Sequence, residues 1–315
     1  MSPLRLPGGL TAAPLGLSLV VDAALGEPPE AAHPVVWMGR YCERVIGADP
    51  AGAGTGRALR GATATAGGVA VSALVAAATD AAVVRLPARI RPALRAAGLW
   101  PLLALRGLCD AAVRVADALD DGDLDRARSG LRWLVGRDLT GLVPPLLAGA
   151  AVESVAENLS DAVVAPLLYG RLAGLPGAAV HRFANTADAT VGDRGRHRLG
   201  GRAAARLDDL LGIVPARMAA VSIALAAPAG GGSSVGALRL WRRDGGNTAS
   251  PNAGRPMAAM AGALGVRLEK VGHHVLNSGG RDPGSADVLR AVRIARAATG
   301  MCVLGCAALP RPIRA

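Results

Sequence analysis

The sequence has 315 residues, of which 51% are hydrophobic but only 2% aromatic, and its formal net charge is +11. The apolar residues are mainly Ala, Val and Leu, and the chain has 42 Gly; this composition suits close helix packing and disfavours a β-sandwich. The charge is nearly all arginine in separate loops without aromatic stacking platforms, which excludes nucleic-acid binding and is typical of an inner-membrane protein. We therefore expect a mainly α, multi-pass membrane helical protein with polar cytoplasmic loops, in one integral-membrane domain over residues 1–315; a soluble Ala-rich helical enzyme is the alternative.

Two apolar stretches near the N-terminus predict membrane segments. Residues 6–21 carry no charge and are expected to form the first one. Residues 61–79 are also uncharged, and the apolar character continues to residue 84. Between them, the Gly- and Pro-rich residues 22–47 form a turn-rich loop in which a regular helix begins only near Val35.

Residues 99–137 change character and predict a soluble amphipathic helical hairpin inserted between membrane segments. Apolar residues recur there at helical spacing, with Arg and Asp on the opposite face. Asp123 is the expected N-cap of the second helix.

The remaining chain alternates apolar and polar segments. A final apolar helix is expected over 287–309, within a C-terminal helix and tail at 281–315. The segments before it are an apolar stretch at 139–181, a polar stretch at 182–209, an apolar stretch at 210–230, a Gly/Ser/Asn loop at 231–256 and a helix at 256–265.

Three acidic residues interrupt the apolar segment AVESVAENLSDAVVAPLLYG, residues 151–170. Glu153, Glu157 and Asp161 are spaced four apart, so a helix would place them on one face. Like charges in an apolar helix persist only beside compensating cations, such as Mg²⁺, Arg or a cationic substrate. A solvated acidic face is the alternative, although the neighbouring residues are too apolar to favour it.

The polar segment RFANTADATVGDRG, residues 182–195, offers further oxygen ligands. Asn185, Thr186 and Asp188 are of the types found in Mg²⁺–phosphate sites, although a helix cap or Asx turn would use the same residues. Asp209 opens the next apolar helix, where a favourable interaction with the helix dipole is an equally good explanation.

Arginines and a rigid turn suggest a phosphate site in the C-terminal half. Arg217 lies two turns into an apolar stretch and needs an anionic partner there. Ser250, Asn252 and neighbouring residues of SPNAG form a turn before a helix, where exposed backbone N–H groups together with Arg255 would hold an anion. The chain contains no GxxxxGK[ST] motif, so this is not a Walker A loop.

The N-terminal loop contributes three polar candidates. Asp22, Glu27 and His33 lie in a stiff Pro-rich stretch. A lone histidine is more often structural than catalytic, so both interpretations of His33 stay open.

Six strings, in this order and spacing, resemble the cobinamide-phosphate synthase (CobD/CbiB-type) family over roughly residues 12–280. They are DAALGEPPEAAHPVVWMGR at 22–40, VGRDLT at 135–140, VESVAENLSDAVVAPLLY at 152–169, LPGAAVHRFANTADATVG at 175–192, ARLDDLLGIVPAR at 205–217 and SPNAGRPMAAMAGALGVRL at 250–268. Asp193 and His274 stand where the family pattern favours Tyr, and Arg255-Pro256-Met257 where Trp-Pro-Glu is common, which puts substrate contacts in question.

The resemblance implies a carbon–nitrogen (acid–amine) ligase of cobalamin biosynthesis in the cell inner membrane, with its active site facing the cytoplasm. The reaction would use ATP and Mg²⁺ to attach (R)-1-aminopropan-2-ol or its O-phosphate to a propionate of adenosylcobyric acid. The family's polar signature falls on Glu153, Glu157, Asp161, Asn185, Thr186, Asp188, Asp209, Arg217 and Asn252. Whether the amine is phosphorylated, the number of spans, the oligomeric state and association with other cobalamin-pathway enzymes stay open.

Chemistry suggests roles for these groups. A carboxylate reacts with an amine only after activation, which ATP supplies as an acyl-phosphate or acyl-adenylate. We expect Glu157, Asp161 and Asp188 to bind Mg²⁺–ATP, and Glu153 to accept the proton of the attacking ammonium. All loops of the site must then meet on one face, so residues 210–230 are expected to be re-entrant or interfacial.

Two other classes compete with the ligase. In a membrane transporter, buried carboxylates would form an ion path, but the long polar loops argue against it. A non-catalytic membrane signalling or scaffold protein of the same fold would not need all of the acidic residues that this chain retains.

Overall fold

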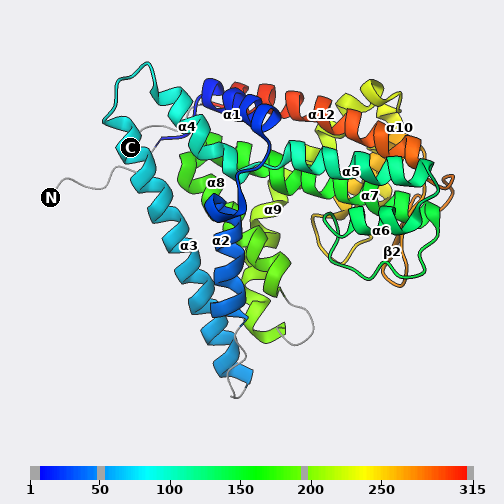
Figure 1. The fold of residues 1–315 in the computed structure, drawn as a ribbon, viewed down its shortest axis with the longest axis horizontal. Helices are drawn as coiled ribbons and strands as arrows, with labels where there is room; N and C mark the ends of the chain where they lie inside the picture. The colour runs from blue at the N-terminus through cyan, green and yellow to red at the C-terminus, as the bar shows by residue number, and fades with distance from the viewer. Residues whose placement is uncertain (1–7, 48–53, 193–197, 311–315) are drawn as a thin grey trace. The chain divides into compact units, whose positions relative to one another are not determined.

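The computed structural model describes residues 8–47, 54–192 and 198–310 (Figure 1). Within these ranges the chain is mainly helical, and five helical stretches are long and apolar enough to cross a membrane. They are Gly56–Val84, Arg91–Asp120, Pro144–Val191, Gly200–Gly230 and Ser285–Ala308. The chain is a mainly α, multi-pass membrane protein, as predicted.

The helices pack into two units that interleave along the chain. Unit 1 comprises Met1–Ala104, Ala165–Gly212 and Val303–Ala315, and unit 2 comprises Leu105–Val164 and Ile213–Cys302. Each is described by itself below; the single domain over residues 1–315 and the limits of its hairpin insertion stay predictions.

Unit 1 begins with helices shorter than a membrane is thick. Helix α1 (Ala12–Leu25) has 14 residues, about 21 Å at 1.5 Å per residue, whereas a span needs about 20 residues. In the described part of the predicted segment 6–21, the helix begins at Ala12 and continues to Leu25; whether it crosses the membrane stays a prediction. After a 3₁₀ turn (Glu30–Ala32), α2 (Pro34–Tyr41) begins one residue before the predicted Val35 and runs into a π-helical turn (Cys42–Ile46).

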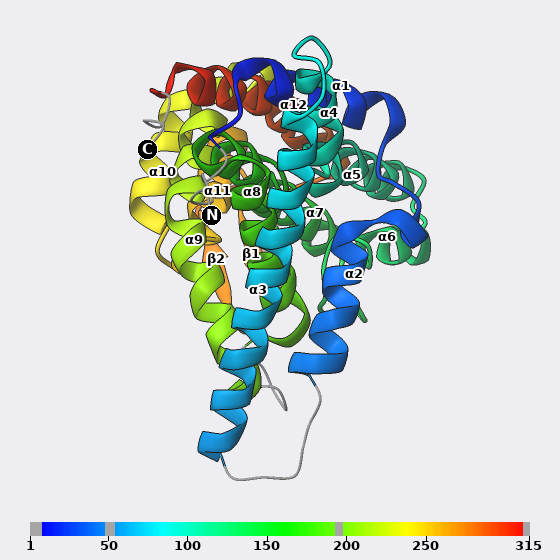
Figure 2. The same ribbon diagram turned by 90° about the vertical axis from the view of Figure 1, so that its left-hand side faces the viewer.

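Helix α3 (Gly54–Val84) confirms the predicted membrane segment and extends it (Figure 2). Its one acidic residue, Asp80, is 2% exposed and accepts two hydrogen bonds from Arg95, at 2.7 and 3.1 Å. Arg95 lies on α4 (Arg91–Leu99), which leads into the 3₁₀ turn Trp100–Leu102. A bidentate pair balances the buried charge, so Asp80 does not end the helix.

Helix α8 (Ala165–Val191) packs along α3 and is kinked at Ala173–Gly174, where Gly174 has a φ of 67°. Arg171, just before the kink, is buried and donates to the backbone carbonyls of Leu10, Cys306 and Leu309. It thereby ties the N-terminal segment and the end of α12 to α8.

Unit 2 contains the predicted hairpin as α5 (Leu105–Asp120) and α6 (Leu124–Leu131), which pack together. The predicted N-cap is confirmed, because the Asp123 carboxylate accepts from the Arg126 N–H at 2.9 Å. Helix α5 also packs on α7 (Pro144–Leu159), which continues into a π-helical turn (Ser160–Val164). The placement of this hairpin in water stays a prediction, and α5 lies within one of the five apolar stretches.

Helix α9 (Arg198–Ala226) runs without a break through Pro215. A proline cannot donate to the carbonyl four residues earlier, but the Tyr169 hydroxyl donates to that carbonyl, Leu211 O, at 2.7 Å. A re-entrant turn within residues 210–230 is therefore wrong, whereas packing of this segment at the membrane interface stays a prediction. A 3₁₀ turn (Ala227–Gly230) follows.

The segment predicted as a Gly/Ser/Asn loop over residues 231–256 contains helix α10 (Ser234–Asp244), so that prediction is wrong over those residues. Ser233 caps α10 by accepting from the Gly236 N–H at 3.0 Å, and α10 packs on α11 (Gly254–Leu264), which confirms the helix predicted at 256–265.

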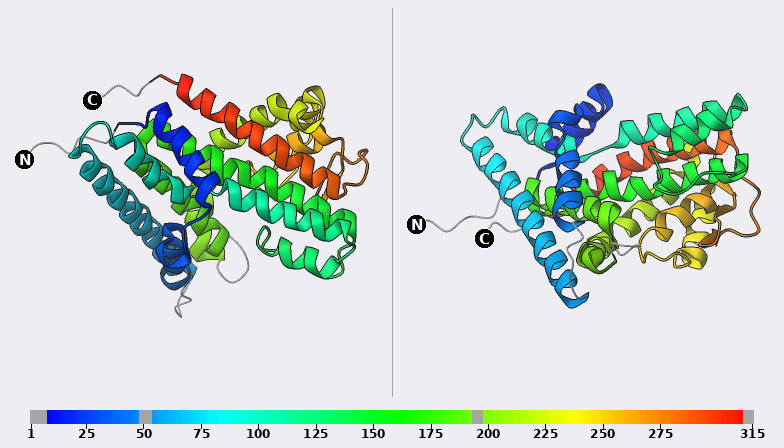
Figure 3. Two further views of the ribbon diagram at one scale, coloured as in Figure 1. Left: turned by 45° about the horizontal axis from the view of Figure 1, so that its top comes forward. Right: turned by 60° about the horizontal axis from the view of Figure 1, so that its bottom comes forward.

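The chain ends with a small hairpin and a long helix. Strands β1 (Leu268–Lys270) and β2 (His274–Leu276) pair antiparallel, with Glu269 opposite Val275. Helix α12 (Ser285–Ala308) confirms the last predicted apolar helix and is one continuous helix (Figure 3).

Candidate functional site

The polar residues of the N-terminal loop meet α8 within unit 1. His33 is buried; its Nδ1 accepts from the Val35 N–H at 3.3 Å, which leaves Nε2 to donate to Glu27 Oε2 at 3.3 Å. The hydrogen bond from His33 is the main reason why the pKa of Glu27 lies below its usual value. Burial opposes this effect, and electrostatic attraction to His33 and Arg182 adds to it. His33 therefore both caps α2 and positions the Glu27 carboxylate.

Arg182 links this loop to the RFANTAD segment. Its Nη1 donates to Asn185 Oδ1 at 3.2 Å, and its charge acts on Glu27. Thr186 donates to the Arg182 carbonyl at 2.8 Å, and its methyl group lies beside Gly39 of α2. We call Glu27, His33, Arg182 and Asn185 the N-terminal polar cluster. Arg182 is not among the site residues expected from the sequence.

The other acidic candidates of unit 1 lie on three helices. Asp22 is buried on α1, while Asp188 on α8 and Asp209 on α9 are half-buried. The Asp188 side chain lies against Gly192, where a Cβ atom would collide with its Oδ1.

Glu153, the first residue of the acidic trio, is an internal ion-pair centre of unit 2. It is 5% exposed; its Oε1 lies 2.8 Å from His274 Nε2, and its Oε2 accepts from Arg137 Nη2 at 3.2 Å. The compensating cation expected for an acidic group in an apolar helix is therefore Arg137, with His274 as a second partner. A solvated acidic face is wrong for Glu153.

Glu157 and Asp161 are half-buried and follow on the same segment. Asp161 lies in the π-helical turn Ser160–Val164, so the α-helical spacing assumed for the trio does not continue past Ser160. Such turns are rare and often occur at functional sites.

Arg217, Asn252 and Arg255 form a second site in unit 2, which we call the arginine pair site. Arg217 Nη1 donates to Asn252 Oδ1 and to the Ile213 carbonyl, both at 2.9 Å. Arg255 is close enough to repel Arg217, and it lies over Gly245 and Gly246.

The two guanidinium groups of this site have no carboxylate partner among the described residues. The anion expected beside Arg217 is therefore absent from the described residues. The neutral amide oxygen of Asn252 accepts from Arg217 instead, and the Arg255 guanidinium lies nearby. Two neighbouring guanidinium groups repel each other until an anion lies between them, and phosphate or carboxylate oxygens fit their fork geometry.

The backbone N–H groups of the SPNAG turn already have hydrogen-bond acceptors in or beside the turn. Ser250 Oγ accepts from the N–H groups of Asn252 and Ala253, at 3.2 and 3.4 Å, and Thr248 Oγ1 accepts from Gly254 N–H at 3.1 Å. The expectation of exposed N–H groups at this turn is wrong, because these hydroxyls cap them. An anion at this place would meet the arginine side chains rather than an open backbone nest.

Asp244 fastens the end of α10 to the β-hairpin region. It is buried, pairs with Arg243 at 2.7 Å and accepts from the Asn277 N–H at 2.7 Å. The Arg243 hydrogen bond is the main reason why the pKa of Asp244 lies below its usual value, against the effect of burial. Asp244 is not among the site residues expected from the sequence, because its partner Asn277 is distant in the chain.

The predicted metal ligands are divided between the units: Glu157 and Asp161 belong to unit 2, and Asp188 to unit 1. In the part of the chain that the structure describes, no three His, Cys, Asp or Glu side chains are gathered as a metal site. The Mg²⁺ site stays a prediction.

Comparison with known proteins gives one consistent family. The family model described as "CobD/Cbib protein" matches residues 15–298. A cobalamin biosynthesis protein CobD of Rhodobacter capsulatus is 38% identical over 309 residues, covering 93% of this chain and 96% of that protein. Those of Mycobacterium tuberculosis and Dehalococcoides mccartyi are 40% and 39% identical, covering 89% and 82% of this chain and 90% and 84% of theirs.

No solved structure matches this chain. The family match covers most of the chain, including the N-terminal polar cluster, the Glu153 centre and the arginine pair site, and relatives of similar length align almost end to end. The chain therefore belongs to the CobD/CbiB family of cobalamin biosynthesis proteins.

Proposed function

We propose that this chain is an ATP-dependent ligase that joins (R)-1-aminopropan-2-ol or its O-phosphate to a propionate carboxylate of adenosylcobyric acid. The observation that carries this proposal is the arginine pair site, where two guanidinium groups have no carboxylate partner in the described residues. In a protein of the corrinoid pathway, the anions available to fill it are nucleotide phosphate, amine phosphate and the propionate itself.

ATP activates the propionate as an acyl-phosphate or acyl-adenylate, and the chain's own residues position and neutralise the reactants. Arg217 and Arg255 hold phosphate oxygens, while Asn252 fixes the direction of the Arg217 guanidinium at 2.9 Å. This arrangement places fixed positive charge where phosphate charge develops.

Glu153 is our candidate for the group that accepts the proton of the attacking ammonium. Each of its oxygens has a hydrogen-bonding partner, Arg137 or His274. A carboxylate oxygen accepts more than one hydrogen bond, so the amine approaches a remaining lone pair without breaking either contact.

Glu157 and Asp161 supply the hard oxygen ligands that Mg²⁺ prefers, and Mg²⁺ bound to a nucleotide needs only one or two carboxylates besides phosphate and water. Both are half-buried in unit 2. Asp188 stays a predicted third ligand, and Asn185, Thr186 and Asp209 stay predicted substrate contacts, because these four residues belong to unit 1.

We place the site on the cytoplasmic side of the inner membrane, where ATP is found. Asn247 is exposed between α10 and α11, and the four native cysteines are buried. In the Asn247→Cys variant, a membrane-impermeant maleimide should react only after the inner membrane is opened. Reaction in intact spheroplasts would refute this orientation.

The function is tested by complementing a cobalamin auxotroph and by measuring ATP- and aminopropanol-dependent cobinamide formation by the purified protein. The wild type and the Arg114→Gln control, which changes an exposed arginine of α5, should restore growth. Glu157→Gln and Asp188→Asn should not. Full activity of both variants would remove the metal-site proposal, and failure of the wild type would remove the ligase.

A further inference from the structure

Helix α10 has a second, outward face besides the one that packs inside unit 2. Ala237, Leu240 and Asp244 are buried, and α10 approaches α11 closely where Gly236 meets Gly262. On the outward side, Val235 is 76% exposed and Leu238 37% exposed. Arg239 and Arg242 follow these apolar residues one helical turn later, at the spacing that places them on the same face.

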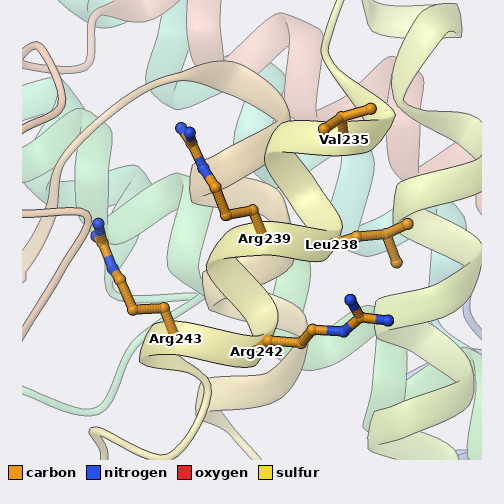
Figure 4. Close-up of a pocket in the computed structure, with 5 residues that line it drawn as sticks. All are labelled: Val235, Leu238, Arg239, Arg242 and Arg243. Carbon is orange, nitrogen blue, oxygen red and sulfur yellow. The ribbon is translucent and has the colours of Figure 1, made fainter.

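These side chains line a shallow recess of about 490 Å³, together with Arg243. Figure 4 looks onto this outward face: Val235, Leu238 and Arg242 lean toward one edge of it, and Arg239 and Arg243 toward the other. Arg243 is neutralised by Asp244 through two hydrogen bonds. Arg239 and Arg242 have no ion-pair partner within the described ranges, so they carry the available positive charge of the recess.

Helix α10 follows closely after the apolar helix α9 in the chain. Val214, Val221 and Leu225 are exposed along one stripe of α9, as expected for a lipid-facing side. Only the 3₁₀ turn and three residues separate α9 from α10. Arg290 fixes this connection by donating to the carbonyls of Gly230 and Gly231, at 2.9 and 2.8 Å. A helix that begins so soon after an apolar stretch long enough to cross a membrane is expected at the level of the lipid headgroups.

We propose that α10 lies in the membrane interface and that its recess binds an anionic phospholipid. Val235 and Leu238 contact the upper part of an acyl chain, while Arg239 and Arg242 bind the phosphate. Arginines beside apolar residues at a membrane interface pack their aliphatic stems against the acyl chains and keep their guanidinium groups at the headgroups. A net-negative headgroup is preferred, because the cationic group of a zwitterionic lipid would be repelled by the second guanidinium.

The test uses the full-length protein, purified and delipidated in a neutral detergent. Native mass spectrometry titrates it with phosphatidylglycerol or phosphatidylcholine. The Arg239→Gln/Arg242→Gln variant is compared with Arg114→Gln/Arg132→Gln, which removes the same charge from exposed positions outside α10. Unfolding midpoints of all variants are measured in parallel.

The wild type should prefer phosphatidylglycerol, and the α10 double variant should lose about 25-fold in affinity for it, from about 5-fold per arginine. The control should bind like the wild type, and Arg239→Lys/Arg242→Lys should retain most of the binding. If the double variant unfolds, Arg242→Gln alone carries the test, with about 5-fold loss expected.

Three results would overturn the proposal. They are equal affinity for the two lipids, unchanged affinity in the α10 variants, and displacement of the lipid by inorganic phosphate at the same concentration, which would indicate a soluble-anion site instead.

Discussion

Two polar sites of unit 2 differ in whether the protein balances its own charge. At Glu153, a buried carboxylate has both oxygens occupied, by Arg137 and His274. At the arginine pair site, Arg217 and Arg255 repel each other, and an amide oxygen, not a carboxylate, lies against Arg217.

The difference separates a site that is complete by itself from one that is completed by a ligand. A balanced buried pair contributes to the fold, and removing one partner leaves an uncompensated charge. An unbalanced pair of cations costs stability until an anion arrives, and such costs are typical of binding sites. The comparison therefore assigns a structural role to the ion pairs of Glu153, alongside the proton-accepting role proposed for its carboxylate, and a binding role to the arginines.

The largest expected effect is on stability, at Glu153. Glu153→Ala should lower the free energy of unfolding in detergent by about 3–5 kcal/mol, because it leaves Arg137, whose side chain is only 19% exposed, without its anion. Glu269→Ala, which breaks the partly exposed pair with Arg267, is the control and should cost at most about 1 kcal/mol. Equal losses in the two variants would show that the Glu153 centre is not a buried structural pair.

The arginine pair should respond in the opposite way. Arg217→Gln and Arg255→Gln should each lower the rate of cobinamide formation by about 10²–10³-fold, as removal of a group that stabilises developing charge does. Their unfolding midpoints should stay unchanged or rise, because repulsion between the guanidinium groups is relieved. A large fall in stability with little loss of rate would reverse the roles assigned to the two sites.

A smaller effect is expected at the turn that carries Asn252. Ser250→Ala removes the acceptor for two N–H groups and should cost about 1 kcal/mol, comparable to the loss of a helix cap. Ser250→Thr keeps the hydroxyl and should restore both stability and rate. If Ser250→Ala abolished the reaction at unchanged stability, Ser250 would be a direct ligand of phosphate.

The smallest effect concerns pH and the N-terminal polar cluster. The pKa of Glu27 in the folded protein lies below its ordinary value of 4.5, chiefly because His33 donates to the carboxylate. The stabilisation from this contact is therefore present above pH 4.5 and is lost as pH falls through the folded-state pKa. Unfolding midpoints measured from pH 6 to pH 3 should fall less steeply for Glu27→Gln than for the wild type; parallel curves would contradict the pairing.

Features that depend on neighbouring residues, such as helix starts and N-caps, could be predicted from the sequence. The start of α2 near Val35, the Asp123 cap and the start of α11 all follow from turn residues and capping groups adjacent to the helix. The long uncharged run of α3 is equally local. The convergence of the RFANTAD segment with the N-terminal loop, in contrast, became visible only in the structure.

The errors come from contacts that join distant parts of the chain. A re-entrant turn was one expectation for residues 210–230, but α9 continues there, and the Tyr169 hydroxyl, 42 residues before Leu211, satisfies the carbonyl that Pro215 leaves open. The sequence marks His274 only as a departure from the family pattern. Its contact with Glu153 was missed because the two residues are 121 positions apart in sequence, while His274 Nε2 lies 2.8 Å from Glu153 Oε1. Helix α10 was missed because its Gly- and Ser-rich start is typical of a loop, whereas Gly236 serves close packing against Gly262.

The most direct test of the ligand-completed site is the binding of a non-hydrolysable ATP analogue to the purified full-length protein, measured by titration calorimetry with Mg²⁺ present. The wild type and Arg114→Gln should bind alike, and Arg217→Gln/Arg255→Gln should bind at least about 10-fold more weakly, as expected when charge-assisted hydrogen bonds to phosphate are lost. Equal affinity of all three proteins for the nucleotide would contradict the assignment of the arginine pair to phosphate.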